Sequence, residues 1–171
     1  RQALFTYVES ELLGIESSLM EPKTEYGRAD KAAAWMLLAK LYLNASVYTG
    51  TAKNTECITY VKKVIGAAKY SLTPTYSNMF KADNNTSAEI IFPITFDGIH
   101  SKTWGGTTFI VHASVGGSMT PADFGIDGGW GGLRTTSAFV DKFSDISGAT
   151  DKRAMFYTNG QNKVINDVFA F

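Results

Sequence analysis

Apolar side chains recur every three or four positions over residues 30–47, and this periodicity constrains the fold more than any other feature of the sequence. The stripe consists of Ala34, Leu37, Leu38, Leu41, Tyr42 and Ala45. This spacing places the side chains on one face of an α-helix, because a helix completes a turn in about 3.6 residues. Asp30 can cap the start of this helix, and Tyr48-Thr49-Gly50 ends it. The segment therefore predicts an amphipathic helix with one buried face.

Two further segments have the same periodicity. Residues 2–19 carry an apolar face of Leu4, Tyr7, Val8, Leu12, Ile15 and Leu19, whereas Glu9, Glu11 and Glu16 are expected to face solvent. Residues 53–69 carry Cys57, Ile58, Val61, Val64, Ile65 and Ala68 on one side and lysines on the other. A short connection joins the second and third helices, which predicts an antiparallel hairpin. Because the first pattern is already running at residue 1 without a capping residue, we expect the native chain to extend further toward its N-terminus.

The hairpin carries the residue spacing of the tetratricopeptide repeat. Trp35-x-x-Leu38-Ala39-x-x-Tyr42 matches the first helix of that repeat, whose large side chains fill the groove left by small ones on the next helix. Cys57-x-x-x-Val61-x-x-Val64 falls at the corresponding positions of the second helix if the turn is about six residues longer than usual. A generic amphipathic hairpin is the alternative. Both interpretations place these residues in the core.

The composition changes after Pro74, and the periodicity weakens. Residues 88–96 form an apolar run that predicts a strand, with Pro93 at an edge or a bulge. Within the Gly-, Thr- and Ser-rich residues 97–134, the β-branched run 107–111 predicts another short strand. A last helix is expected over residues 135–145, and a strand-like run over residues 164–171.

These patterns predict a mainly α fold. Tetratricopeptide-like helical hairpins form a partial scaffold in residues 1–72, and a loop-rich segment with short strands and a helix follows in residues 73–171. With 171 residues the chain has the length of a single domain or of a piece of one. We expect both parts to belong to the same domain of a longer parent protein.

Charge and composition exclude several classes of function. The chain has 16 Lys and Arg against 16 Asp and Glu, so it lacks the positive surplus that drives binding to nucleic-acid phosphates. No apolar run approaches the roughly 20 residues that cross a bilayer. Cys57 is the single cysteine of the sequence, which excludes an internal disulfide and a cysteine zinc site.

Motifs for cofactors and metals are incomplete, so we predict neither. His100 and His112 have no metal-ligand spacing, and a phosphate-binding loop is absent. The segment from Asp83 begins like an EF-hand loop but has Ala88 and Ile94 where that loop requires Gly and Glu.

Enzyme motifs are also incomplete. Gly116-Gly117-Ser118-Met119-Thr120 lacks the closing glycine of a hydrolase nucleophile elbow. Asp141, Asp145 and Asp151 could supply the paired carboxylates of a glycosidase, but helix ends gather Asp through capping. We therefore predict that the chain is not an enzyme.

The tryptophans point to binding. Trp35 lies on the helical stripe and is expected in the core. Trp104 lies between small polar residues, and the glycines around Trp130 keep neighbouring side chains away from its ring. An exposed indole face is a common platform for the C–H surface of a sugar. The alternative is that each ring is tucked under its own loop.

Several short motifs follow one another in a specific order over about residues 25–160. They are Gly27-Arg28-Ala29-Asp30-Lys31-Ala32-Ala33-Ala34, Lys40-Leu41-Tyr42-Leu43, Tyr70-Ser71-Leu72, Tyr76-Ser77-Asn78-Met79-Phe80, Glu89-Ile90-Ile91-Phe92, Gly129-Trp130-Gly131-Gly132-Leu133-Arg134-Thr135-Thr136, and Phe143 followed by Asp151-Lys152-Arg153. Their order and spacing resemble the SusD/RagB-like family, the surface lipoproteins with which Bacteroidetes capture glycans for uptake.

The resemblance implies a non-enzymatic glycan-binding subunit. It also implies partnership with a TonB-dependent transporter, and an outer-membrane location through a lipid attached outside this chain. We expect Trp104 and Trp130 to stack on the glycan within one binding surface, with Asp97, Asp127 and Arg134 as polar partners. A protein-interaction module, in which the helical hairpin holds a partner, is the alternative, and a glycoside hydrolase is a third hypothesis.

Overall fold

The computed structural model describes residues 1–81, 83–96, 100–101 and 103–157. Its elements are α1 (Gln2–Ile15), η1 (Glu16–Ser18), α2 (Lys31–Leu43), α3 (Ala45–Thr49), α4 (Asn54–Gly66), η2 (Tyr76–Phe80), η3 (Asn84–Thr86), α5 (Gly106–Ala113), η4 (Pro121–Phe124) and α6 (Ser137–Val140). None of the residues that the structure describes forms a strand. The prediction of a mainly α fold is confirmed, and the short strands are absent from the described ranges.

Contacts divide the chain into two compact units, Arg1–Thr95 and Phe96–Phe171, which we describe separately. The division predicted at residue 72 follows the change in composition, and the membership of both parts in one larger domain stays a prediction. No described helix is both long enough and apolar enough to cross a membrane.

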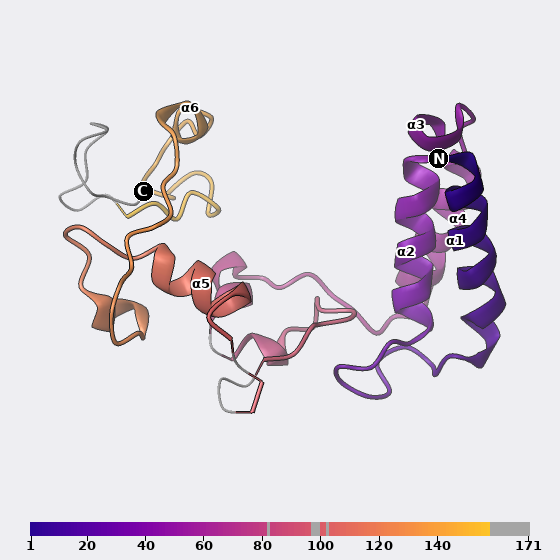
Figure 1. The fold of residues 1–171 in the computed structure, drawn as a ribbon, viewed down its shortest axis with the longest axis horizontal. Coiled ribbons are helices and arrows are strands. Elements are labelled where there is room, and N and C mark those ends of the chain that lie inside the picture. The colour runs from indigo at the N-terminus through magenta and orange to yellow at the C-terminus, as the bar shows by residue number, and fades with distance from the viewer. Residues whose placement is uncertain (82, 97–99, 102, 158–171) are drawn as a thin grey trace. The chain divides into compact units, whose positions relative to one another are not determined.

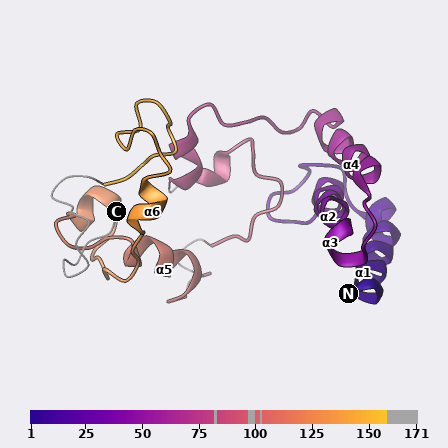
Figure 2. The same ribbon diagram turned by 90° about the horizontal axis from the view of Figure 1, so that it is seen from above.

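In the first unit, α1, α2 and α4 lie side by side and alternate in direction (Figures 1 and 2). α2 packs against α4, and α1 packs against α2 and α3. The predicted helices over residues 2–19 and 53–69 are confirmed. The helix predicted over residues 30–47 is interrupted at Asn44, whose backbone N–H donates to the carbonyls of Lys40 and Tyr42 before α3 begins.

The α2 side of this unit's core lies where the tetratricopeptide spacing predicted it, whereas Phe5 of α1 and Tyr60 of α4 are core residues that this spacing did not predict. The buried cluster consists of Phe5, Leu38, Ala39, Tyr42, Ala45 and Tyr60. Trp35, Cys57 and Val61 are partly buried against this cluster. Trp35 therefore packs on the core while keeping part of its ring exposed.

The predicted apolar faces were too wide. Leu4, Tyr7, Ile15, Leu37, Ile58 and Ile65 are exposed, although each was assigned to a buried stripe. On α1 the inward side chain is that of Phe5, which lies next to the predicted stripe residue Leu4. The periodicity of the sequence thus predicted the centre of the buried face of α1 about one residue away from its position in the structure.

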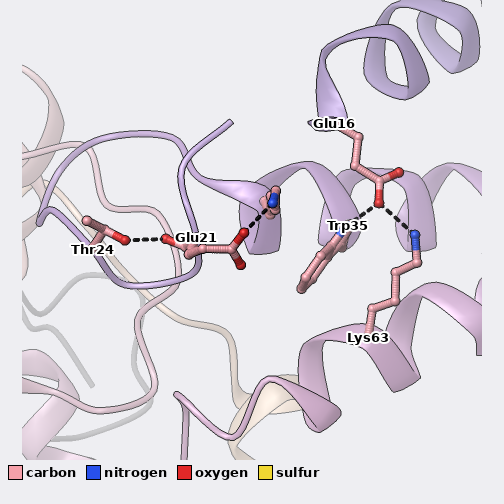
Figure 3. Close-up of polar contacts among 6 residues, drawn as sticks. Glu16, Glu21, Thr24, Trp35 and Lys63 are labelled. Carbon is pink, nitrogen blue, oxygen red and sulfur yellow. Dashed lines mark hydrogen bonds and ion pairs between the residues drawn. The ribbon is translucent and has the colours of Figure 1, made fainter. Parts of the chain in front are cut away.

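The expectation that Glu9 and Glu16 face solvent was wrong. Glu9 pairs with Lys53, the residue that precedes α4, with 2.7 Å between Oε1 and Nζ. Glu16 Oε1 accepts hydrogen bonds from Lys63 Nζ at 2.6 Å and from Trp35 Nε1 at 2.8 Å, as Figure 3 shows. Burial raises the pKa of Glu16, but the bonds from Lys63 and Trp35 outweigh it and hold this pKa below its ordinary value.

Asp30 caps α2, as predicted, and is 2% exposed. Its Oδ1 accepts from the N–H of Ala33 at 3.0 Å, and its Oδ2 accepts from the N–H of Lys23 at 2.7 Å. The hydroxyl of Tyr70 lies 3.4 Å from Oδ2. Burial and the neighbouring carboxylate raise the pKa of Tyr70 to about 12. One carboxylate therefore joins the start of α2 to segments on both sides of the hairpin.

The remaining secondary-structure predictions need correction. The prediction of a strand over residues 107–111 is wrong, because these residues belong to α5. β-Branched residues favour a strand where neighbouring strands pack beside them, and no residue that the structure describes forms a strand. The helix predicted over residues 135–145 is limited to the single turn α6, capped by Thr136, whose side chain accepts from the N–H of Phe139. Residues 88–96 form no strand. The run over residues 164–171 lies outside the described residues.

Replacing Leu38 by Ala should lower the free energy of unfolding by about 2–5 kcal/mol, because Leu38 is 0% exposed in the centre of the first unit. Chemical denaturation of the full-length protein measures this loss. Leu37→Ala is the matched control, because Leu37 is 52% exposed and its loss should change stability by less than about 0.5 kcal/mol. Equal effects of the two variants would contradict the described orientation of α2.

Replacing Asp30 by Ala should cost about 1–2 kcal/mol, because it removes the cap of α2 and leaves the Lys23 amide without its acceptor. Tyr70→Phe is the control, since it removes only the long bond to Asp30 and should cost less than about 1 kcal/mol. Denaturation curves of both variants test the ranking. A larger loss in Tyr70→Phe would show that the cap is not the main contribution.

Candidate functional site

The second unit brings Trp104 and Trp130 together. Their ring centroids lie 6.1 Å apart, and the ring planes are tilted by 35°. Trp104 is 83% exposed and Trp130 is 43% exposed. Trp104 is therefore not tucked under its own loop, and both indoles contribute to one exposed aromatic surface. Their role in binding remains a prediction.

Backbone hydrogen bonds attach the segment around Trp130 to the C-terminal end of α5. The amides of Trp130, Gly131 and Leu133 donate to the carbonyls of His112, Val115 and Ala113 at 2.8, 2.9 and 2.8 Å, respectively. These bonds hold the backbone of Trp130 against a helix, which limits the positions that its indole can take.

Two glycines make this close approach possible. A Cβ atom on Gly129 would lie 2.4 Å from the carbonyl oxygen of Val115, and one on Gly116 would lie 2.8 Å from the Cα of Gly131. Real Cβ atoms do not come this close to backbone atoms. The glycine-rich sequence around Trp130 therefore serves contact between two backbone segments, in addition to leaving the ring uncovered.

His112 and Phe109 of α5 complete the aromatic surroundings of Trp130. The imidazole of His112 stacks on the indole with centroids 4.9 Å apart and planes 29° apart, and the Phe109 ring lies 6.3 Å away. His112 was considered from the sequence only as a metal ligand, so this contact was not predicted. The available signal was the spacing of three between Phe109 and His112, which shares one helix face, but a strand was predicted there.

The predicted polar partners differ in their surroundings. Asp127 extends into solvent and its Oδ1 lies 3.3 Å from Nε2 of His112, so it is linked to Trp130 through that ring. Arg134 Nη1 donates to the carbonyls of Gly131 and Leu133 at 2.5 and 3.2 Å, which ties its guanidinium to the Trp130 segment. Asp97 lies outside the described residues. Binding by each of them stays a prediction.

Comparison with known proteins assigns the chain to a family. No protein-family model matches the sequence. The sequence is 43% identical to the starch-binding protein SusD of Bacteroides thetaiotaomicron in an alignment of 145 residues that covers 82% of this chain. The chain belongs to the SusD-like family. It spans about a quarter of the relative's length, because the match covers 26% of that protein.

Two of the three carboxylates considered for a glycosidase, Asp145 and Asp151, organise loops of this SusD-like chain. Asp145 accepts hydrogen bonds from the amides of Ser147, Ala149 and Thr150 at 2.9, 3.0 and 3.1 Å. Asp151 forms an ion pair with Arg153 at 2.7 Å. Bonds from Ser147 lower the pKa of Asp145 to about 2, and Arg153 lowers that of Asp151 to about 2. A general acid needs a raised pKa, so both carboxyls are poorly suited to protonate a leaving group.

Metal binding by clustered side chains has no support in the described ranges. No group of three or more His, Cys, Asp or Glu side chains converges there.

Asp145 should keep its loop hydrogen bonds until the pH falls close to 2. Its folded pKa lies below the ordinary 3.8, so the bonds stabilise the loop above about pH 4 and are lost as the pH falls through about 2. An NMR titration of the Asp145 carboxyl, followed also at the Ser147 amide, measures the midpoint. In Asp145→Ala the acid-dependent change at Ser147 should disappear. A wild-type midpoint near 3.8 would contradict the described loop.

Proposed function

We propose that the protein carrying this chain binds a polysaccharide or oligosaccharide at the cell surface and does not cleave it. The observation that carries the proposal is the exposed pair of Trp104 and Trp130, 6.1 Å apart. Indole rings bind sugars through the C–H faces of the pyranose rings, and this needs no net charge on the protein. The chain's formal net charge of zero is consistent with such a ligand.

Starch, or an oligosaccharide derived from it, is the ligand class that we favour. The family relative is named a starch-binding protein. The rings of Trp104 and Trp130 are tilted by 35° rather than coplanar. A tilted pair suits consecutive sugar units that turn relative to each other, as the units of an α-linked glucan do. Asp127 contacts Nε2 at the edge of the His112 ring, and its exposed carboxylate is available to accept hydrogen bonds from sugar hydroxyls.

The further parts of the proposal rest on the resemblance to the SusD/RagB-like family. The bound glycan is passed to a TonB-dependent transporter of the outer membrane. The protein is surface-exposed at that membrane through a lipid anchor outside this chain. The helices of the first unit form a scaffold, and the second unit contributes the aromatic surface.

Trp104→Ala should weaken binding of maltoheptaose, a soluble starch fragment, by roughly ten- to a hundredfold, because one aromatic stack contributes about 1–3 kcal/mol by analogy with nucleic-acid bases. Isothermal titration calorimetry on the full-length protein measures the affinity. Folding should be unaffected, since Trp104 is 83% exposed.

Trp35→Phe is the matched control, because it removes a tryptophan that packs on the helical core and donates to Glu16. This variant should be less stable but should bind maltoheptaose as the wild type does. Unchanged affinity in Trp104→Ala would refute the stacking role. A glycan array of plant, host and microbial polysaccharides extends the test, and a wild-type protein that binds none of them would favour the protein-interaction module.

A further inference from the structure

The imidazole of His112 has a contact on one ring face and at each of its two ring nitrogens. One face stacks on Trp130 at 4.9 Å. Its Nδ1 lies 2.9 Å from the carbonyl oxygen of Thr108, one turn earlier in α5. Its Nε2 lies 3.3 Å from Oδ1 of Asp127. The ring is therefore fixed in orientation by contacts from its own helix and from the segment that carries Trp130.

Both partners of the ring nitrogens are hydrogen-bond acceptors. A neutral imidazole carries one N–H, so it can donate to the Thr108 carbonyl or to the Asp127 carboxylate, but not to both. A protonated imidazole donates to both and also places a positive charge against the face of the indole. Asp127 is the charged group that the described contacts place against this ring, whereas Thr108 offers a neutral carbonyl. Both ring contacts of His112 can therefore be hydrogen bonds only when both ring nitrogens carry a proton.

The same residue also positions the backbone of Trp130. The carbonyl of His112 accepts the Trp130 amide at 2.8 Å, so main chain and side chain of one residue contact main chain and side chain of the other. An indole stacked on an imidazole offers a sugar only its opposite face and its edges. The contact therefore determines which surface of Trp130 is available, and Trp104, 6.1 Å away, packs against a ring that is already oriented.

We infer that His112 is a positioning residue of the glycan site, which orients the Trp130 indole by stacking and makes sugar binding depend on pH through its bond to Asp127. The inference rests on the proposed function, because it concerns the same surface. His112 contacts one face of the Trp130 indole, and this role does not require contact between His112 and the glycan.

Two substitutions separate the stack from the hydrogen bonds. His112→Ala removes both, and it should weaken maltoheptaose binding by about three- to tenfold, the range expected for an aromatic pair. His112→Phe keeps a flat ring against Trp130 but has no ring N–H, so it should retain most of the affinity at high pH. Near-UV circular dichroism of the indoles reports their fixed orientation, and this signal should fall in the Ala variant and persist in the Phe variant.

The pH profile tests the bond to Asp127. Wild-type affinity should fall by about two- to fivefold when a rise in pH removes the second ring proton of His112, because the ion pair with the exposed Asp127 is weak. The profile should be flat in His112→Phe. His100→Ala, which removes the other histidine of the chain, is the control and should keep the wild-type profile.

Several results would overturn the inference. His112→Ala that binds as tightly as the wild type, or His112→Phe that loses as much affinity and dichroism as His112→Ala, would exclude positioning by stacking. A pH dependence that persists in His112→Phe, or that disappears in His100→Ala, would exclude the bond to Asp127 as its origin. A wild-type protein that does not bind maltoheptaose at any pH would instead contradict the proposed starch ligand.

Discussion

The first unit depends on the buried carboxylate of Asp30. Its oxygens bind the N–H of Ala33 at the start of α2, the N–H of Lys23 in the preceding loop and the hydroxyl of Tyr70 after α4. A buried carboxylate without partners would be strongly unfavourable, so each of these bonds also constrains the segment that provides it. The entry to α2 and the exit from α4 are thereby held around one side chain, next to the apolar cluster through which the two helices pack.

The sequence predicted the helices of the first unit well, because their core positions share a helical period. Leu38, Ala39 and Tyr42 are buried where the tetratricopeptide spacing placed them. The orientation of α1 and η1 was less predictable, since Glu9 of α1 and Glu16 of η1 turn inward toward Lys53, which precedes α4, and Lys63 of α4. Which charged residues meet across two helices depends on the register between them, and periodicity within one helix carries no information about that register.

In the second unit, the sequence predicted the two tryptophans that form the aromatic surface but did not predict the secondary structure that carries them. The tryptophans were identified because small neighbours leave their rings uncovered, and the structure does place the two rings side by side. Helix α5 was missed because β-branched residues dominate its local propensity, whereas the bonds from the distant segment around Trp130 to the carbonyls at its C-terminal end have no local sequence signal. Missing α5 also hid His112, whose position against the indole follows only from the helix. The local sequence pattern thus identified the two tryptophans, but the contacts that hold Trp130 come from residues distant in the sequence.

The backbone contact at Gly129 makes the two halves of the aromatic surface unequal in their tolerance of sequence change. Any side chain at this position would collide with Val115, so the course of the chain beside Trp130 is fixed by space. At Gly105, next to Trp104, this steric restriction is absent, because a Cβ there would meet only the Thr103 hydroxyl at an ordinary 3.9 Å. Redesign of ligand preference would therefore begin on the Trp104 side, where new side chains can be introduced while the other ring serves as a constant reference point.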